Sequence, residues 1–185
     1  MSIQTILRLG NPLLHERSIE VDHPDSAEIH NLVEDMFDTM RNYEGAGLAA
    51  PQIGIMKRVI IFGFESNPRY PDAEPVPETV LINPVIEQLG SEVEKDWEGC
   101  LSIPGMRGMV TRPTHIRYSG YTQHGDFLER DVTGFHARVV LHECDHLDGI
   151  LYVQRIKDMR EYGFIEELEE SLRFSPLPCD TCEIE

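Results

Sequence analysis

The stretch F-H-A-R-V-V-L-H-E-C-D-H-L-D, residues 135–148, decides how this chain folds, because the other segments must be arranged around it. Its apolar residues recur at helical spacing, and Gly149 is a stop signal directly after it. Inside this expected helix, His142, Glu143 and His146 spell H-E-x-x-H. The two histidines are four positions apart, so both imidazoles lie on one face and can bind the same ion.

The acid of this motif has a different place on the helix. Glu143 lies about 100° around the helix from His142, so its carboxylate can reach a water beside the ion without becoming a ligand. Apolar neighbours bury the motif, and buried imidazoles and carboxylates need partners, which a metal supplies. The alternative is a pair of ordinary core histidines that are hydrogen-bonded to their neighbours. A carboxylate base next to a Lewis acid is typical of hydrolytic metal sites.

A catalytic metal site usually has three protein ligands, so the third must come from another segment. Cys100 lies in W-E-G-C-L-S-I-P, at the end of an expected strand. Glu166 follows the motif on an expected last helix, where zinc peptidases of the thermolysin kind keep a glutamate. Several acidic neighbours of Glu166 favour a solvated helix face instead.

The flanking segments indicate an α+β fold, in which antiparallel or mixed sheets surround the central H-E-x-x-H helix. Apolar spacing predicts an N-terminal helix over residues 25–44, with Asp25 as N-cap and Gly45 and Gly47 at its end. A buried strand is expected at 58–64 and a proline-rich surface loop at 65–78.

The second half of the chain has a different pattern. Consecutive antiparallel strands are expected from residue 79 to 131, and a C-terminal helix over 157–173. At the usual domain size, residues 1–173 form a single domain, followed by a flexible tail over 174–185.

Composition excludes several classes of protein. The chain is 41% hydrophobic and 26% charged, which is typical of globular domains. Its 16 basic and 33 acidic residues give a net charge of −17, so a general basic surface for nucleic acid or anionic membranes is not expected. No apolar run reaches the ~20 residues that cross a bilayer, and no signal peptide is evident, so the cytoplasm is the expected location.

The cysteines other than Cys100 carry little chemistry. Cys144 is expected to pack as a small apolar residue inside the central helix. Cys179 and Cys182 form C-x-x-C, but no second pair completes a zinc site, and a solvent-exposed tail is expected there.

Three separated strings of this sequence resemble peptide deformylases: G-A-G-L-A-A-P-Q-I-G at 45–54, E-G-C-L-S at 98–102 and H-E-C-D-H-L at 142–147. They stand in the order and at the spacing of that family, and the resemblance covers roughly residues 5–165. It implies a metal-dependent hydrolase that removes the N-formyl group from the N-terminal formylmethionine of new polypeptides and releases formate. The implied partners are therefore formylmethionyl nascent peptides.

The resemblance also implies a role for each matched residue. Cys100, His142 and His146 correspond to the metal ligands, and Glu143 corresponds to the general base. The Gln52 side-chain amide and the Leu101 backbone N–H correspond to the donors that stabilise the oxyanion. The family implies Fe²⁺, with Ni²⁺, Co²⁺ or Zn²⁺ as substitutes, whereas one thiolate and two imidazoles alone would favour zinc.

The same matching gives a substrate-binding set. Ala46 and Gly47 on one side, and the strand that ends at Gly99 on the other, would bind an extended peptide through main-chain hydrogen bonds. An apolar pocket would select methionine, and the positions that match its lining are Ala46, Glu98, Phe135, Arg138 and Val139. Arg138 replaces an aliphatic residue of some relatives, and its stem is expected to curl over the pocket rim. Arg107 and Arg112 are expected to pair with buried acids such as Glu98.

One departure from the family pattern leaves alternatives open. Leu141 stands where the family usually has glutamine, which could lower activity tenfold or more while metal binding persists. An inactive metal-binding or ribosome-associated homologue is therefore one alternative, and a zinc endopeptidase with Glu166 as third ligand is another. We further expect a monomer, with a transient ribosome contact near Lys157 and Arg160.

Overall fold

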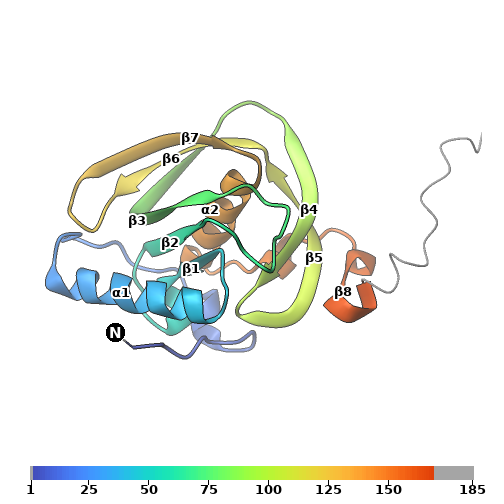
Figure 1. Cartoon of the computed structure of the whole chain (residues 1–185), viewed down its shortest axis with the longest axis horizontal. Coiled ribbons are helices and arrows are strands. Elements are labelled where there is room, and N and C mark those ends of the chain that lie inside the picture. Colours follow the sequence, from blue (N-terminus) through green and yellow to red (C-terminus); the bar gives the residue numbers. More distant parts are fainter. Residues whose placement is uncertain (1, 169–185) are drawn as a thin grey trace, which may run out of the picture.

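The computed structural model describes residues 2–168 and shows an α+β fold (Figure 1). Its α-helices include α1 (Ala27–Asn42) and α2 (Gly134–Leu147). Five strands form one sheet in the order β1-β2-β3-β6-β7, and three form a second sheet in the order β4-β5-β8. The strands are β1 (Gly47–Ala49), β2 (Val59–Phe64), β3 (Val76–Gln88), β4 (Val93–Cys100), β5 (Ile103–Pro113), β6 (His115–Tyr121), β7 (Phe127–Thr133) and β8 (Tyr162–Phe164).

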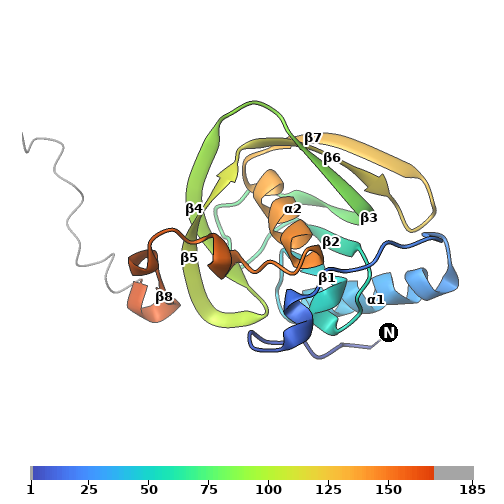
Figure 2. The same ribbon diagram turned by 180° about the vertical axis from the view of Figure 1, so that it is seen from behind.

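All strand pairs within the two sheets are antiparallel, as expected from the sequence for residues 79–131. Seen from behind, α2 runs through the middle of the molecule, between the long β4–β5 hairpin and the five-stranded sheet (Figure 2). The helix that carries H-E-x-x-H is therefore central, as expected. No helix within residues 2–168 is long and apolar enough to cross a membrane.

Strand β2 is buried on both faces, which explains its unbroken apolar sequence. Ile60 and Phe62 point towards α2, whereas Val59 and Ile61 belong to the cluster under α1. This alternation follows from the two-residue period of a strand. The sheet is therefore packed between the two helices.

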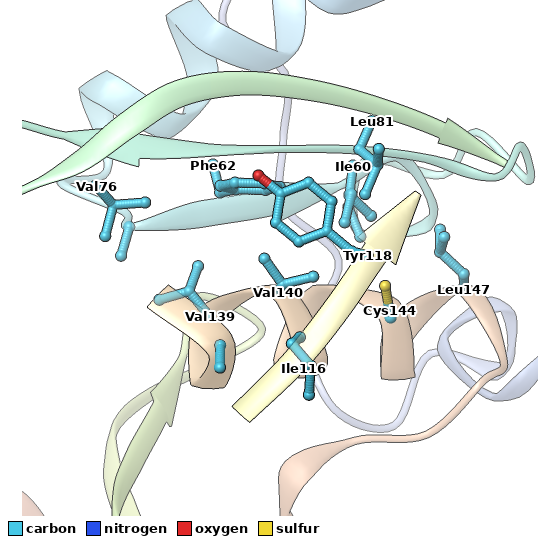
Figure 3. Close-up of a cluster of buried hydrophobic side chains, with 13 residues drawn as sticks. Ile60, Phe62, Val76, Leu81, Ile116, Tyr118, Val139, Val140, Cys144 and Leu147 are labelled. Atoms are coloured by element: carbon cyan, nitrogen blue, oxygen red, sulfur yellow. The ribbon is translucent and has the colours of Figure 1, made fainter. Parts of the chain in front are cut away.

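The apolar face of α2 fixes its position against the five-stranded sheet. Figure 3 shows Val139, Val140 and Cys144 of the helix facing Phe62 and Tyr118 of the strands. Because this face is used for packing, Arg138, His142 and Asp145 lie on another side of α2, where they contact residues of β4 and β5.

The N-terminal helix begins two residues later than the sequence pattern suggests. Ser26, not Asp25, is the N-cap, because its hydroxyl accepts a hydrogen bond from the Ile29 N–H at 3.4 Å. The left-handed residue after the helix is Glu44, with φ 54°, and the Gly45 N–H closes the end by bonding to the Met40 carbonyl at 2.9 Å.

The helix predicted over 157–173 is wrong for its first part. A 3-10 turn occupies Met159–Glu161, and Tyr162–Phe164 form β8, which pairs with β5. Pairing with a distant strand outweighs the local helical spacing. Residues 165–168 are helical, while the rest of that prediction, the tail and its C-x-x-C pair lie outside the described residues.

Three further 3-10 turns lie in the connections, at Pro12–His15, Ala50–Ile53 and Tyr152–Arg155. The turn at Ala50–Ile53 carries Gln52, which is expected from the sequence to be an oxyanion donor. The proline-rich segment ends sooner than expected, since β3 already starts at Val76.

Candidate metal centre

Three side chains converge between α2 and the end of β4. His142 and His146 are one turn apart on α2, and Cys100 is the last residue of β4. The ligand atoms of all three lie within 4.8 Å of one another. All three side chains are almost completely buried. Such a group of one sulfur and two imidazole donors is the kind of site that holds a transition metal.

The spacing of these atoms fits a single ion. The Cys100 Sγ lies 3.3 Å from the His146 Nε2. Tetrahedral ligands at about 2.3 Å for sulfur and about 2.0 Å for imidazole nitrogen are separated by about 3.5 Å. The two imidazole rings are edge-on to each other, with centroids 5.1 Å apart. The residues present therefore fit a metal ion.

His142 is held in one orientation by a carboxylate. Its Nδ1 lies 2.9 Å from the Glu98 Oε2. Burial alone would raise the pKa of Glu98, but Arg112 and His142 outweigh burial and hold it well below its usual range. An ionised carboxylate can only accept a hydrogen bond, so the His142 Nδ1 donates to Glu98. The His142 Nε2 is then free to act as a metal ligand together with Cys100 and His146.

Glu98 is itself held by two arginines. Arg112 forms a two-pronged contact, with its Nε 2.8 Å from Oε1 and its Nη2 2.9 Å from Oε2. The Arg138 Nη1 donates to Oε1 at 3.0 Å. The pairing of Arg112 with Glu98 confirms the sequence prediction. For Arg107, no ion pair with an acid is seen among residues 2–168, and its Nη2 donates to the Arg69 carbonyl at 2.6 Å.

The predicted position of Arg138 on the pocket rim is wrong. Its side chain is only 5% exposed, and its guanidinium points inward. Besides Glu98, it donates to the carbonyls of Val110 at 2.9 Å and Glu94 at 3.0 Å. The Arg138 side chain points inward because it pairs with the buried carboxylate of Glu98. A buried ion pair is stable only when its remaining hydrogen-bonding groups also have partners, and the two carbonyls supply them.

The Cys100 sulfur lies in surroundings that favour the thiolate. Burial raises its pKa, but the nearby His146 and His142 outweigh burial and lower the pKa well below the ordinary value. The Ser102 N–H and the Gln52 Nε2 each lie 3.4 Å from Sγ. A thiolate is the form that binds a metal.

Glu143 points into the same space with one oxygen free of protein partners. Burial raises the pKa of its carboxyl to about 7, although His142 and His146 act in the opposite direction. Within residues 2–168, its Oε2 has no hydrogen-bond partner. A buried carboxylate with an unused oxygen and a pKa near neutrality is well suited to accept a proton.

Gly47 leaves the room that Glu143 needs. A Cβ placed on Gly47 would lie 2.5 Å from the Glu143 Oε1 and 2.8 Å from its Cδ. Real atoms do not approach that closely, so glycine is required for the present position of the carboxylate. Sequence reasoning gave Gly47 a place in peptide binding and missed this contact.

Gln52 is buried beside the centre, not on a surface loop, and the residue is only 2% exposed. Its Oε1 accepts a hydrogen bond from the Ala49 N–H at 2.8 Å. This bond fixes the amide so that Nε2 faces the Ser102 Oγ at 3.2 Å and the Cys100 sulfur. The Leu101 backbone follows Cys100 directly, so both expected oxyanion donors lie next to the expected ligand.

A pocket opens next to these groups, and every residue of the expected substrate-binding set lines it. That set is Ala46, Gly47, Glu98, Gly99, Phe135, Arg138 and Val139. Sequence reasoning missed Arg69, Tyr70 and Trp97, which line it as well. Tyr70 packs on Phe135 with ring centroids 4.9 Å apart. Arg69 and Tyr70 lie in the proline-rich loop, and an arginine next to an aromatic residue in a loop could have indicated that they line a binding pocket.

Other candidates lie outside the cluster or serve packing. Glu166 is exposed and does not belong to the converging group of ligand atoms. Cys144 is buried, which raises the pKa of its thiol and leaves it unreactive. Asp145 pairs with Arg112 at 2.6 Å and with Arg155. Leu141 packs at the edge of the apolar cluster under the five-stranded sheet.

Comparison with known proteins agrees with this geometry. The model of the polypeptide deformylase family matches residues 3–162. Peptide deformylase 1 of Nitrosomonas europaea is 56% identical over 166 residues, which are 90% of this chain and 94% of that protein. Peptide deformylase 2 of Pseudomonas putida is 51% identical over 179 residues, which are 94% of this chain and 98% of that protein.

Solved structures show the same fold. The Met-Ala-Ser-bound class I type b peptide deformylase of Acinetobacter baumannii superimposes with a TM-score of 0.80 at 39% identity, covering 84% of this chain and 99% of that one. The peptide deformylase of Thermotoga maritima gives a TM-score of 0.75 at 33% identity, covering 85% of this chain and 100% of that one.

Proposed function

The chain belongs to the polypeptide deformylase family, and from this premise we propose how its buried centre removes the N-formyl group of N-terminal formylmethionine and releases formate. The observation that carries the proposal is the convergence of Cys100, His142 and His146 next to the unpartnered oxygen of Glu143. A buried base beside a metal-binding cluster is suited to amide hydrolysis near neutral pH.

Cys100, His142 and His146 would hold the metal, which we propose is Fe²⁺, with Ni²⁺, Co²⁺ or Zn²⁺ as substitutes. When bound, the ion supplies Lewis-acid chemistry, which polarises the formyl oxygen and makes a nearby water more acidic. Support for the ligand set comes from the thiolate-favouring surroundings of Cys100 and from the Glu98 contact that orients His142.

Glu143 is the proposed general base. It would take a proton from the attacking water and give it to the amine that leaves, which restores the carboxylate. Without a bound metal, burial raises the pKa of this carboxyl to about 7.

Gln52 and Leu101 are the proposed oxyanion donors. Attack on the formyl carbon places negative charge on its oxygen, and each fixed donor aimed at that charge contributes about 3 kcal/mol. The Gln52 side chain is held in place, because its Oε1 accepts a hydrogen bond from the Ala49 N–H.

The peptide would bind in extended form between two strand edges. β1 lies at the end of the five-stranded sheet, and β4 lies at the end of the three-stranded sheet. Both edges border the pocket, through Ala46 and Gly47 on one side and Gly99 on the other. Main-chain hydrogen bonds to such edges do not depend on the side chains of the peptide, so the enzyme can act on nascent peptides of many sequences.

The first side chain of the peptide would enter the pocket beside α2. Phe135, Val139 and Ala46 give it apolar walls that suit methionine. Glu98 and Arg138 line the same pocket, but they neutralise each other. The pocket would therefore accept an apolar side chain such as that of methionine.

We also propose that the chain acts as a monomer in the cytoplasm and contacts the ribosome only transiently. Nascent peptides are the substrates of its family, which supports a place close to protein synthesis. Lys157 and Arg160 are exposed, although Arg160 pairs with Asp158 at 2.6 Å. With a net charge of −17, such a contact must be local and sensitive to salt. Co-sedimentation with ribosomes at low and high salt tests this.

The experiment that tests the proposed function is formate release from formyl-Met-Ala-Ser. Protein is prepared without oxygen, loaded with Fe(II) or Ni(II), and compared with a Glu143→Ala variant. Formate release by wild type that is lost in the variant supports the proposal and shows that Leu141 is compatible with activity. Cleavage of internal peptide bonds without formate release, seen by mass spectrometry, would overturn it in favour of an endopeptidase.

A further inference from the structure

The expected metal ligands come from two parts of the molecule that pack separately. The apolar face of α2 belongs to the cluster under the five-stranded sheet, with Val140 and Leu147 among its members. Cys100 belongs to another apolar cluster, together with Val110 and Tyr152. The spacing between the histidines and the cysteine therefore depends on the contacts that join α2 to β4 and β5.

The contacts that join α2 to β4 and β5 are polar. In the first half of α2, Arg138 makes most of them. Arg138 and His142 are one turn apart on the helix, and both reach the same carboxylate on β4. Arg138 bonds to the Glu98 Oε1 at 3.0 Å, and His142 lies 2.9 Å from Oε2. The same guanidinium bonds to the Val110 carbonyl on β5 and the Glu94 carbonyl on β4.

Arg112 cannot replace this link. It lies on β5, in the same sheet as Glu98, so its two-pronged contact with Glu98 does not hold the helix. It reaches α2 only at Asp145, beyond His142, where Arg155 also binds. Arg112 does keep Glu98 partnered when Arg138 is removed, so the fold should survive that change.

We propose that Arg138 is a positioning residue of the metal centre, which ties α2 to β4 and β5 and so sets the spacing between the two histidines and Cys100. The inference rests on the proposed function, because it concerns the same centre. Contacts behind metal ligands typically change metal affinity 10–100-fold when they are lost, although the residue itself never touches the ion.

The test compares Arg138→Met, Arg138→Lys and the control Arg117→Met, which removes an arginine from a half-exposed ion pair with Asp131. Each protein is loaded with Co(II), its metal affinity is measured by competition with a chelator, and its visible absorption spectrum is recorded. We expect Arg138→Met to bind Co(II) at least tenfold more weakly and with a changed spectrum. Arg138→Lys should recover part of the affinity, and Arg117→Met should match wild type.

Two results would overturn the inference. One is a Co(II) affinity within twofold of wild type with an unchanged spectrum, even if the metal-free variant melts at a lower temperature or the peptide KM rises. That pattern would show that Arg138 only stabilises the fold or lines the pocket. The other is wild-type protein that fails to bind Co(II), in which case the proposed function falls as well. Should Arg138→Met not fold, the same affinity and spectral criteria apply to Arg138→Lys.

Discussion

Replacing Gly47 with alanine should disable catalysis while the metal ligands stay in place. The added methyl would lie 2.5 Å from the Glu143 Oε1, whereas ordinary contacts begin at 3.4 Å. The difference, 3.4 minus 2.5, requires the carboxylate or the β1 backbone to move by about 0.9 Å. Both are buried, so neither can move freely.

A displacement of about 1 Å in a catalytic group can cost about 100-fold in rate. We therefore expect kcat/KM for formyl-Met-Ala-Ser to fall by about two orders of magnitude, and the added methyl to lower stability by about 1–3 kcal/mol. Metal content should not change, because Cys100, His142 and His146 are not displaced.

The assay is formate release at several peptide concentrations, with metal content and thermal unfolding measured on the same samples. Gly163→Ala is the matched control, because its methyl would meet Leu168 at an ordinary 3.6 Å. A Gly47→Ala enzyme that retains kcat/KM within threefold of wild type would refute the reasoning about the space around Glu143.

The other predictions concern the ligand set, the oxyanion donor and the carboxylate behind His142. Cys100→Ser should lose most of its bound metal when dialysed against a chelator, whereas Glu166→Ala should keep it, because the exposed Glu166 lies outside the cluster. Gln52→Ala should lower kcat about 100-fold, measured as formate release, with metal content unchanged. Metal-free Glu98→Gln should be less stable by about 3 kcal/mol near pH 7 in urea unfolding, since it breaks a buried ion pair. Because the folded pKa of Glu98 is lowered, wild type holds this advantage above the unfolded pKa of about 4.3 and loses it as the pH falls towards the folded pKa.

Each of these expectations has a contrary outcome. Metal kept by Cys100→Ser but lost from Glu166→Ala would support an endopeptidase ligand set. A Gln52→Ala enzyme with normal kcat would remove Gln52 from the oxyanion role. A stability difference for Glu98→Gln that grows as the pH falls from 6 to 3 would contradict the lowered pKa.

The central helix and the strands could be predicted because their patterns are local. Residues 135–148 repeat at helical spacing, and the apolar run of β2 reflects burial on both faces. The predicted C-terminal helix failed at Tyr162–Phe164, where the partner strand is β5, far away in the sequence. Local spacing carries no information about such a partner.

The site divides in the same way. The two histidines and Glu143 could be placed on one helix from their spacing, but Cys100 as third ligand followed only from the family resemblance. The direction of Arg138 could not be predicted, because its partner Glu98 lies on a distant strand. Sequence reasoning placed Gly47 in the peptide-binding set, but it could not show that Glu143 occupies the space next to this glycine.

The most direct test of the central claim is X-ray absorption at the metal edge of the zinc-loaded protein. The account predicts one sulfur ligand at about 2.3 Å and two imidazole nitrogens at about 2.0–2.1 Å, which are Cys100, His142 and His146. A first shell of nitrogen and oxygen alone, without sulfur, would contradict the assignment of Cys100 and the mechanism built on this centre.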